Sequence, residues 1–202
     1  YRFNNSIDQT AIDINKMIDL DYVNQASEQI AEILKLKSKG KVGNLKDLQD
    51  LYKIKYMAPF SLKNLKDKYD MCISTTALEH FKIPDLKEYL SDAKDILKIN
   101  GLVSSIIDYS DHYSHTDYKI SNLNYLSYSK NAWEKYNNQY LYQNRLRHQD
   151  YIKFFESNGY KIKEIILGNV STPPQIISDE FDVNNRDTFL SWAYFLISKK
   201  NN

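Results

Sequence analysis

Two histidines, His80 and His112, stand in stretches that could carry acid–base chemistry. Each follows a predicted strand, and a histidine side chain titrates in the range that is useful for proton transfer. We take His112 as the candidate catalytic base, with Asp108 at the end of the preceding strand as the second catalytic candidate. The alternative for His112 is an exposed loop histidine without a catalytic role.

The run of Asp108, Asp111, His112 and His115 also contains the residue types that bind divalent metals. Irregular loops often gather such residues without a metal, and a match of spacing alone carries a risk of false positives. We therefore expect no metal site in this run.

Two arginines and one acid remain as candidates. Arg145 and Arg147 could bind a carboxylate or phosphate on a substrate, because a guanidinium offers two parallel donors. The alternative is surface charge or an ion pair with Asp150. Glu79 is either an ion-pair partner or an acid of the site, and the sequence does not separate these two roles.

A strand, a helix and a second strand must position these residues. Apolar runs at 69–74 and 102–107 are typical of buried parallel strands. Between them an amphipathic helix is predicted to begin near Pro84 and to end at Asn100-Gly101. Two parallel strands joined by a helix form a right-handed βαβ unit, so the residues that follow each strand lie at the same edge of the sheet.

The rest of the chain adds further elements. An amphipathic helix with Ile30 and Ile33 on its apolar face is predicted to end at Gly40. The remaining predictions are a strand at 10–14, a short helix at 45–51, a strand at 52–57, short helices within 109–143, a helix at 149–158 and strands at 160–167 and 189–198. The predicted fold class is therefore α/β, with a mostly parallel sheet, an antiparallel C-terminal edge and helices on both faces.

Composition limits the class of protein. The 202 residues suit one domain over 1–202. The 27 Lys and Arg residues nearly balance the 26 Asp and Glu residues, so no global field would attract nucleic acid or an anionic membrane. The lone Cys72 excludes an intrachain disulfide, and no apolar run reaches membrane-spanning length. We expect a cytoplasmic protein without a nucleic-acid partner.

In their order and spacing the motifs resemble the second half of a class I S-adenosylmethionine-dependent methyltransferase, and the likeness spans nearly the whole chain. The motifs are Asp70 opening a strand and Ser74 closing it, Leu78-Glu79-His80, the turn at 98–102, the stretch 107–113, the stretch 144–147 and Asn158-Gly159-Tyr160.

The resemblance implies a Rossmann-like methyltransferase sheet with S-adenosylmethionine as cofactor. It implies that Asp13 accepts hydrogen bonds from the ribose hydroxyls, although a solvated Asp13 at a strand end is the alternative. It also places the loop at Ala58-Pro59 along the adenine, without the acid that this loop often carries. The other residues expected at the cofactor are Ser74, Thr75, Thr76 and His80.

The implied reaction is methyl transfer to a small-molecule, glycan or lipid-intermediate acceptor. We expect the segment 109–147 to be a lid-like insertion over the substrate, with Asp111, Arg145 and Arg147 contacting it. A packed pair of accessory helices without a ligand role is the alternative. The loop after Ser74 lacks the Asn/Asp-Pro-Pro-aromatic signature of many amino-group methylases, which favours oxygen or carbon acceptors.

The resemblance also implies a first strand and a glycine-rich turn before Asp13, and residues 1–10 supply neither. We therefore expect the domain to be N-terminally incomplete and, as given, poorly stable, because a missing central strand leaves backbone groups unpaired. The alternative is a non-catalytic Rossmann-like interaction module that has lost cofactor binding.

Overall fold

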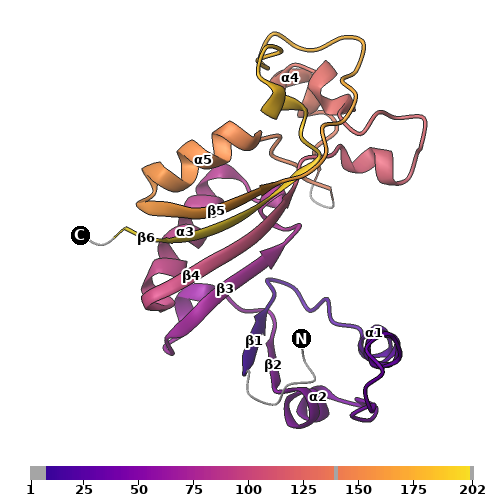
Figure 1. The fold of residues 1–202 in the computed structure, drawn as a ribbon, viewed down its shortest axis with the longest axis vertical. Coiled ribbons are helices and arrows are strands. Elements are labelled where there is room, and N and C mark those ends of the chain that lie inside the picture. Colours follow the sequence, from indigo (N-terminus) through magenta and orange to yellow (C-terminus); the bar gives the residue numbers. More distant parts are fainter. Residues whose placement is uncertain (1–7, 139–140, 201–202) are drawn as a thin grey trace. The chain divides into compact units, whose positions relative to one another are not determined.

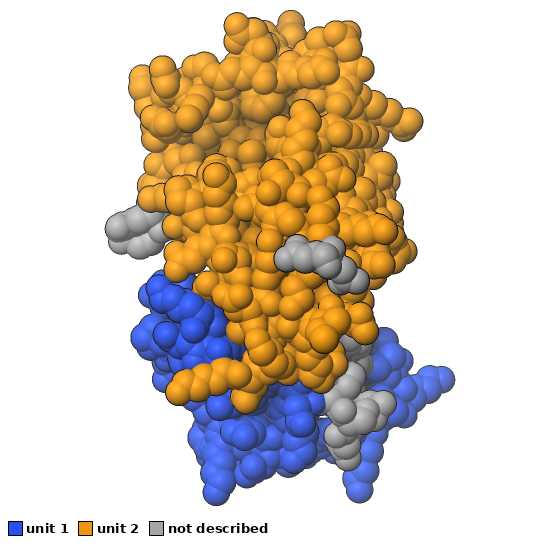
Figure 2. Space-filling model, turned by 90° about the vertical axis from the view of Figure 1, so that its left-hand side faces the viewer, with its two compact units in different colours: residues 1–65 blue, residues 66–202 orange. Residues whose placement is uncertain are grey.

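The computed structural model describes residues 8–138 and 141–200. The chain divides into two compact units, unit 1 at residues 1–65 and unit 2 at residues 66–202 (Figure 2). The single domain predicted over 1–202 stays a prediction. None of the helices in the described ranges has the length and apolar character needed to cross a membrane.

Unit 1 combines a two-stranded sheet with two helices (Figure 1). Its elements are β1 (Gln9–Ile12), α1 (Leu20–Ile33), α2 (Leu45–Tyr52), β2 (Ile54–Met57) and a 3₁₀ turn, η1 (Leu62–Asn64). The strands pair in parallel, with Gln9 opposite Ile54 and Ile12 opposite Met57. A small core fixes α2 on this sheet, and its buried members are Val42, Leu48 and Tyr52.

Helix α1 differs from its prediction at both its end and its buried face. The apolar periodicity predicted a helix to Gly40, but α1 ends at Ile33 and Lys35 has a φ of 53°. The side chains of Ile30 and Ile33 are exposed, whereas Ala31 is buried. The 3.6-residue pattern thus located the helix, and the packing around it selected a different face.

Unit 2 is built on a four-stranded sheet in the order β3-β4-β6-β5 (Figure 1). The strands are β3 (Tyr69–Thr75), β4 (Leu97–Asp108), β5 (Tyr160–Leu167) and β6 (Trp192–Lys199). Strands β3 and β4 are parallel, and β6 is antiparallel to both β4 and β5. The α/β class, the parallel pair and the antiparallel C-terminal edge are confirmed. The described strands form two separate sheets, β1-β2 and β3-β4-β6-β5. Among the described residues, no strand of one sheet is hydrogen-bonded to a strand of the other.

Helices α3 (Ile83–Ile96) and α5 (His148–Ser157) share one core with the unit 2 sheet. They contribute Leu86, Leu90, Ala93, Tyr151 and Phe155, which meet alternate residues of the central strands, Val103, Ile107, Phe195 and Ile197. Pro84 lies in the first turn of α3, as predicted.

The end of α3 was predicted wrongly. Strand β4 already begins at Leu97, so Gly101 lies within the strand instead of ending the helix. A side chain at position 101 would place its Cβ 2.9 Å from Leu97 Cδ2. Gly101 therefore allows the backbone to pack closely against Leu97. The strand pairing shifts register at this point, between Tyr69 and Met71.

The segment after β4 folds into short helices, as expected. They are η3 (His112–His115), η4 (Asn124–Ser127) and α4 (Lys130–Trp133), and the turns η2 (Leu78–His80) and η5 (Arg186–Phe189) lie elsewhere in unit 2. This segment has its own core, formed by Leu123, Tyr125, Leu126 and Trp133 against Ile177, Phe181 and Phe189. It is a packed substructure, and its role as a lid stays a prediction.

Candidate functional site

Strands β3 and β4 end beside each other at one edge of the unit 2 sheet. Thr75 pairs with Ile106, and the N–H of Thr76 donates to the Ile106 carbonyl oxygen at 2.9 Å. Thr76 has a φ of 47°, which turns the chain sharply into η2. The hydroxyl of Ser74 donates to that of Ser105 at 2.9 Å and ties the two strands together just before their ends.

Five side chains at this edge, from the end of β4 and from the two loops, form what we call the acid–histidine cluster: Glu79, His80, Asp108, His112 and His115. The ring centroids of His80 and His112 are 4.8 Å apart, and those of His112 and His115 are 4.9 Å apart. Nε2 of His112 lies 3.6 Å from Oδ2 of Asp108, and Nε2 of His115 lies 3.8 Å from the same oxygen. The structure thus brings together the two histidines that the sequence singled out, although they are 32 positions apart.

Electrostatics couple Asp108 to His112. Burial raises the pKa of Asp108, but the adjacent His112 imidazole and hydrogen bonding to Ser110 outweigh it, so the pKa of this carboxyl lies below its ordinary value. Burial lowers the pKa of His112, but Asp108 and the charge of Glu79 outweigh it, so the pKa of this imidazole is raised. Both shifts favour a carboxylate beside an imidazolium.

Glu79 is the residue that sequence reasoning undervalued. Its side chain is buried, with the whole residue 2% exposed, and neither carboxylate oxygen has a hydrogen-bond partner among the residues that the structure describes. Burial raises the pKa of Glu79 to about 7, and the negative charge of Asp108 adds to this. The only sequence signal was its position beside His80 in a common triplet.

A second segment holds both loops of the cluster in place. The carbonyl oxygen of Tyr142 lies 2.7 Å from Nδ1 of His80. The Gln143 side chain accepts from the backbone N–H of His112 at 3.4 Å and donates to the carbonyl oxygen of Ser110. The N–H of Asn144 donates to the carbonyl oxygen of Glu79 at 2.9 Å. Of these three residues, only Asn144 was part of a motif in the sequence.

The two arginines predicted to bind substrate make their contacts within the chain. Arg147 is buried and donates to the carbonyl oxygens of Tyr109, Thr188 and Leu190 at 2.7, 2.9 and 2.6 Å. Arg145 donates to the carbonyl oxygens of Tyr125 and Tyr128 at 3.1 and 2.6 Å and pairs with Glu180 at 3.3 Å. These contacts favour structural roles, and substrate binding by either arginine stays a prediction.

Asp111 also has an internal role. It is fully buried, and its carboxylate accepts from the N–H of Tyr113 at 2.9 Å and from Asn124 at 3.1 Å. It therefore caps η3, the short helix that carries His112. A direct contact with substrate stays a prediction.

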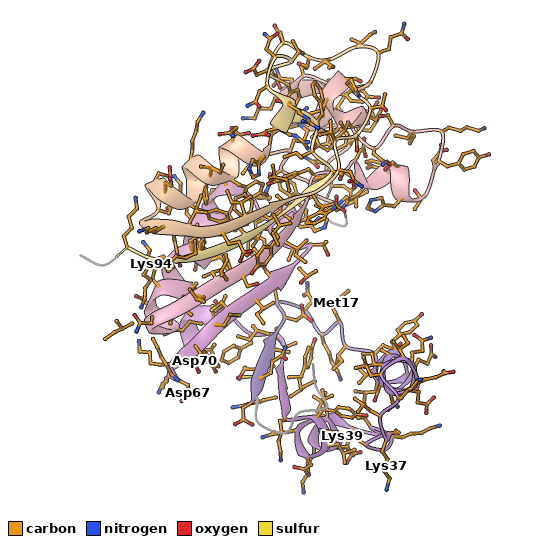
Figure 3. The ribbon with its side chains drawn as sticks, viewed as in Figure 1. Met17, Lys37, Lys39, Asp67, Asp70 and Lys94 are labelled. Atoms are coloured by element: carbon orange, nitrogen blue, oxygen red, sulfur yellow. The ribbon has the colours of Figure 1, made fainter. Side chains whose placement is uncertain are left out.

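The candidates for the cofactor in unit 1 follow its two strands. Asp13 comes directly after β1, and its N–H donates to the Met57 carbonyl oxygen at 3.0 Å. The Tyr56 hydroxyl donates to Oδ2 of Asp13 at 2.9 Å and accepts from the N–H of Met17, a residue labelled in Figure 3, at 3.0 Å. The cis peptide Ala58-Pro59 follows β2. The sequence did not single out Tyr56, which orients the acid.

A groove of about 600 Å³ lies at the other end of β4 and contains none of these candidates. Its lining residues are Ile99, Asn100, Leu102, Lys161, Lys163, Ser198, Lys199 and Lys200. At the same end, Asp70 at the start of β3 (Figure 3) pairs with Lys98 at 2.9 Å. The acid–histidine cluster, not this groove, is the candidate site because it holds the groups that can do chemistry.

Comparisons of the sequence with protein-family models and with curated proteins found no match. Among solved structures, the chain is similar to the PH0226 protein from Pyrococcus horikoshii OT3, with a TM-score of 0.51 at 10% identity over 96% of this chain and 73% of that one. A methyltransferase dependent on S-adenosylmethionine, from Clostridium acetobutylicum ATCC 824, has a TM-score of 0.48 at 12% identity over 96% and 76%.

Magnesium protoporphyrin IX methyltransferase from Synechocystis PCC 6803, solved with bound SAH, has a TM-score of 0.45 at 12% identity over 95% of this chain and 63% of that one. The chain thus spans between 63% and 76% of the length of these three structures. At such identities the likeness concerns the fold alone, and of these three structures it is the PH0226 protein, with a TM-score above 0.5, that supports the predicted architecture.

Proposed function

We propose that this chain, which has the Rossmann-like fold of class I S-adenosylmethionine-dependent methyltransferases, transfers the methyl group of S-adenosylmethionine to a small-molecule, glycan or lipid-intermediate acceptor. The observation that supports this is that, in each of the two sheets, the candidates lie at the carboxyl ends of the two parallel strands. Asp13 and Ala58-Pro59 follow β1 and β2, and Thr75 and Asp108 close β3 and β4. Open α/β sheets bind their ligands outside these ends.

Each cofactor residue then has a specific role. The Asp13 carboxylate, oriented by Tyr56, accepts hydrogen bonds from the ribose hydroxyls. The backbone at Ala58-Pro59 lies along the adenine. In unit 2, the candidates for the cofactor are the hydroxyl groups of Thr75 and Thr76 and the imidazole of His80, at the end of β3 and in η2.

Methyl transfer requires little from the protein beyond orientation of the acceptor relative to the cofactor. Holding the acceptor in line with the sulfonium methyl group supplies on the order of 7–11 kcal/mol of the barrier. His112 takes the proton of an acceptor hydroxyl, and Asp108, whose Oδ2 lies 3.6 Å from the His112 Nε2, stabilises the imidazolium that forms. An oxygen acceptor fits this pair best, because an alcohol must lose its proton on methylation.

Calorimetric titration with S-adenosylhomocysteine tests the cofactor assignment without knowledge of the acceptor. We expect the wild type to bind, and Asp13→Ala to bind at least about tenfold more weakly because two ribose hydroxyls lose their acceptor. Asp8→Ala, which removes an exposed acid just before β1, is the matched control and should bind like the wild type. Absence of heat in the wild type would remove the proposal and leave the interaction-module alternative.

A further inference from the structure

We propose that Glu79, His80 and His112 form a binding site for a divalent transition-metal ion of the zinc type. One ligand atom from each of these side chains lies within 4.8 Å of the other two. This set differs from the Asp-and-His run that the sequence suggested and for which we expected no metal, because Glu79 and His80 come from the loop after β3. The inference rests on this geometry alone and is independent of methyl transfer.

The buried carboxylate of Glu79 is the first argument. A charged group removed from water is normally paired, hydrogen-bonded or bound to a metal. Both oxygens of Glu79 and Nε2 of His112 are buried without a hydrogen-bond partner in the part of the chain that the structure describes. The Glu79 carboxylate and Nε2 of His112, which lies 3.6 Å from Oδ2 of Asp108, come from different loops and lie close together. A cation bound between them would give the Glu79 oxygens the partner that they lack.

The second argument is the orientation of His80. Its Nδ1 lies 2.7 Å from the Tyr142 carbonyl oxygen, which can only accept, so Nδ1 carries the proton and the lone pair is on Nε2. A metal-binding histidine commonly has its other ring nitrogen fixed in this way by a backbone carbonyl. The neighbouring Gln143 holds the backbone of His112, so one segment positions both histidines.

The ligand types indicate which ion would bind. Two imidazoles and one carboxylate suit zinc and its first-row neighbours, whereas magnesium and calcium prefer oxygen ligands alone. Bonds of about 2.1 Å require the ligand atoms to approach to about 3.5 Å of one another, so the side chains must rotate inward by about 1 Å when the ion binds.

Three protein ligands leave one position of a tetrahedral site open. His80 is exposed, so this position can be reached by water or by a substrate oxygen. With the ion bound, His112 is a ligand through Nε2 and no longer takes a proton from an acceptor; an oxygen bound at the open position would lose its proton more easily instead. The carboxylate of Asp108 then lies beside the site, 3.6 Å from the same nitrogen.

The test is metal binding by the full chain, purified with a chelator, in the absence of S-adenosylmethionine. We expect calorimetry to give one zinc ion per chain and cobalt to give visible d–d bands, while magnesium at millimolar concentration gives neither. Glu79→Gln and His112→Gln should each weaken zinc binding at least tenfold. His115→Gln is the matched control, because this histidine stacks on His112 but lies outside the ligand set, and it should bind zinc within about twofold of the wild type.

Because Glu79 is buried, its variant could fail to fold, and circular dichroism should be recorded for each protein. His80→Gln then serves in its place, since the exposed His80 can change without disturbing the core. A folded wild type that binds no zinc overturns the proposal, as does zinc binding that Glu79, His80 and His112 variants leave unchanged or that His115→Gln weakens equally. Binding of S-adenosylhomocysteine is measured separately, so failure of this site and failure of the proposed function are distinguishable.

Discussion

At the residue scale, Arg147 is the buried cation on which several carbonyl groups depend. Replacing it with alanine removes a donor from the carbonyl oxygens of Tyr109, Thr188 and Leu190; the Tyr109 oxygen keeps the Tyr125 hydroxyl as a donor at 2.7 Å, and the other two lose the guanidinium partner. Each such group costs about 1–3 kcal/mol, so we expect Arg147→Ala to lower the free energy of unfolding by about 3 kcal/mol or more. Urea denaturation followed by circular dichroism measures this change.

Lys153→Ala is the control for that variant, because Lys153 lies exposed on the same helix, α5. It should change the free energy of unfolding by less than about 0.5 kcal/mol. Equal effects of the two substitutions would contradict the role assigned to Arg147.

His148 makes stability depend on pH. Burial lowers its pKa below the usual 6.5, Asp187 opposes this shift, and Arg147 adds to it. Below pH 6.5 the unfolded chain therefore binds a proton that the folded chain does not, and stability falls as pH drops from about 6.5 towards the folded-state pKa. Comparing urea midpoints of wild type and His148→Gln at pH 7.5 and 5.5 should show a smaller loss in the variant. An identical loss in both would count against this assignment.

At the element scale, Gly159 ends α5 in a conformation that other residues rarely adopt. Its φ is +75°, and a Cβ there would lie 2.7 Å from Nζ of Lys94, a side chain labelled in Figure 3. We expect Gly159→Ala to destabilise the chain by about 1 kcal/mol, chiefly through backbone strain. Thermal melts of the single variant and of a Gly159→Ala, Lys94→Ala double variant separate the two causes, since the Lys94 end can move. Recovery of full stability in the double variant would show that the clash, not the strain, was responsible.

The elements could largely be predicted from the sequence, and their ends less well. Period-two and period-3.6 patterns with Pro84 and Gly159 located β3, α3, α5 and β5, because local propensity and packing agree there. The start of β4 was missed because Asn100-Gly101 has the residue types of a helix end, whereas tertiary packing of Leu97 extends the strand.

The candidate site was predicted in part for a similar reason. Parallel strands carry His80 and His112 to one edge, which topology alone predicts. The burial of Glu79, the hydrogen bonds of Arg147 and the support from Gln143 depend on contacts between segments far apart in the chain. Short sequence patterns contain no information about such contacts.

At the scale of the whole molecule, the two units differ in how far strand pairing protects their backbone amides from hydrogen exchange. Unit 1 has a two-stranded sheet, whereas in unit 2 the central strands β4 and β6 are paired on both sides. Isolated strand pairs are marginal, so we expect amides of β1 and β2 to exchange with deuterium at least about tenfold faster than those of β4 and β6. Mass spectrometry of peptic fragments measures the rates. Equal protection in both units would contradict the expectation.

The contacts of Arg147 also set how the surroundings of the acid–histidine cluster can respond to a ligand. Its guanidinium donates hydrogen bonds to a carbonyl oxygen just after β4, at Tyr109, and to two just before β6, at Thr188 and Leu190. Neither stretch can shift alone without breaking charge-assisted hydrogen bonds in a dry interior. A rearrangement behind His112 that moved Tyr109 would therefore either carry residues 188–190 with it or break these hydrogen bonds.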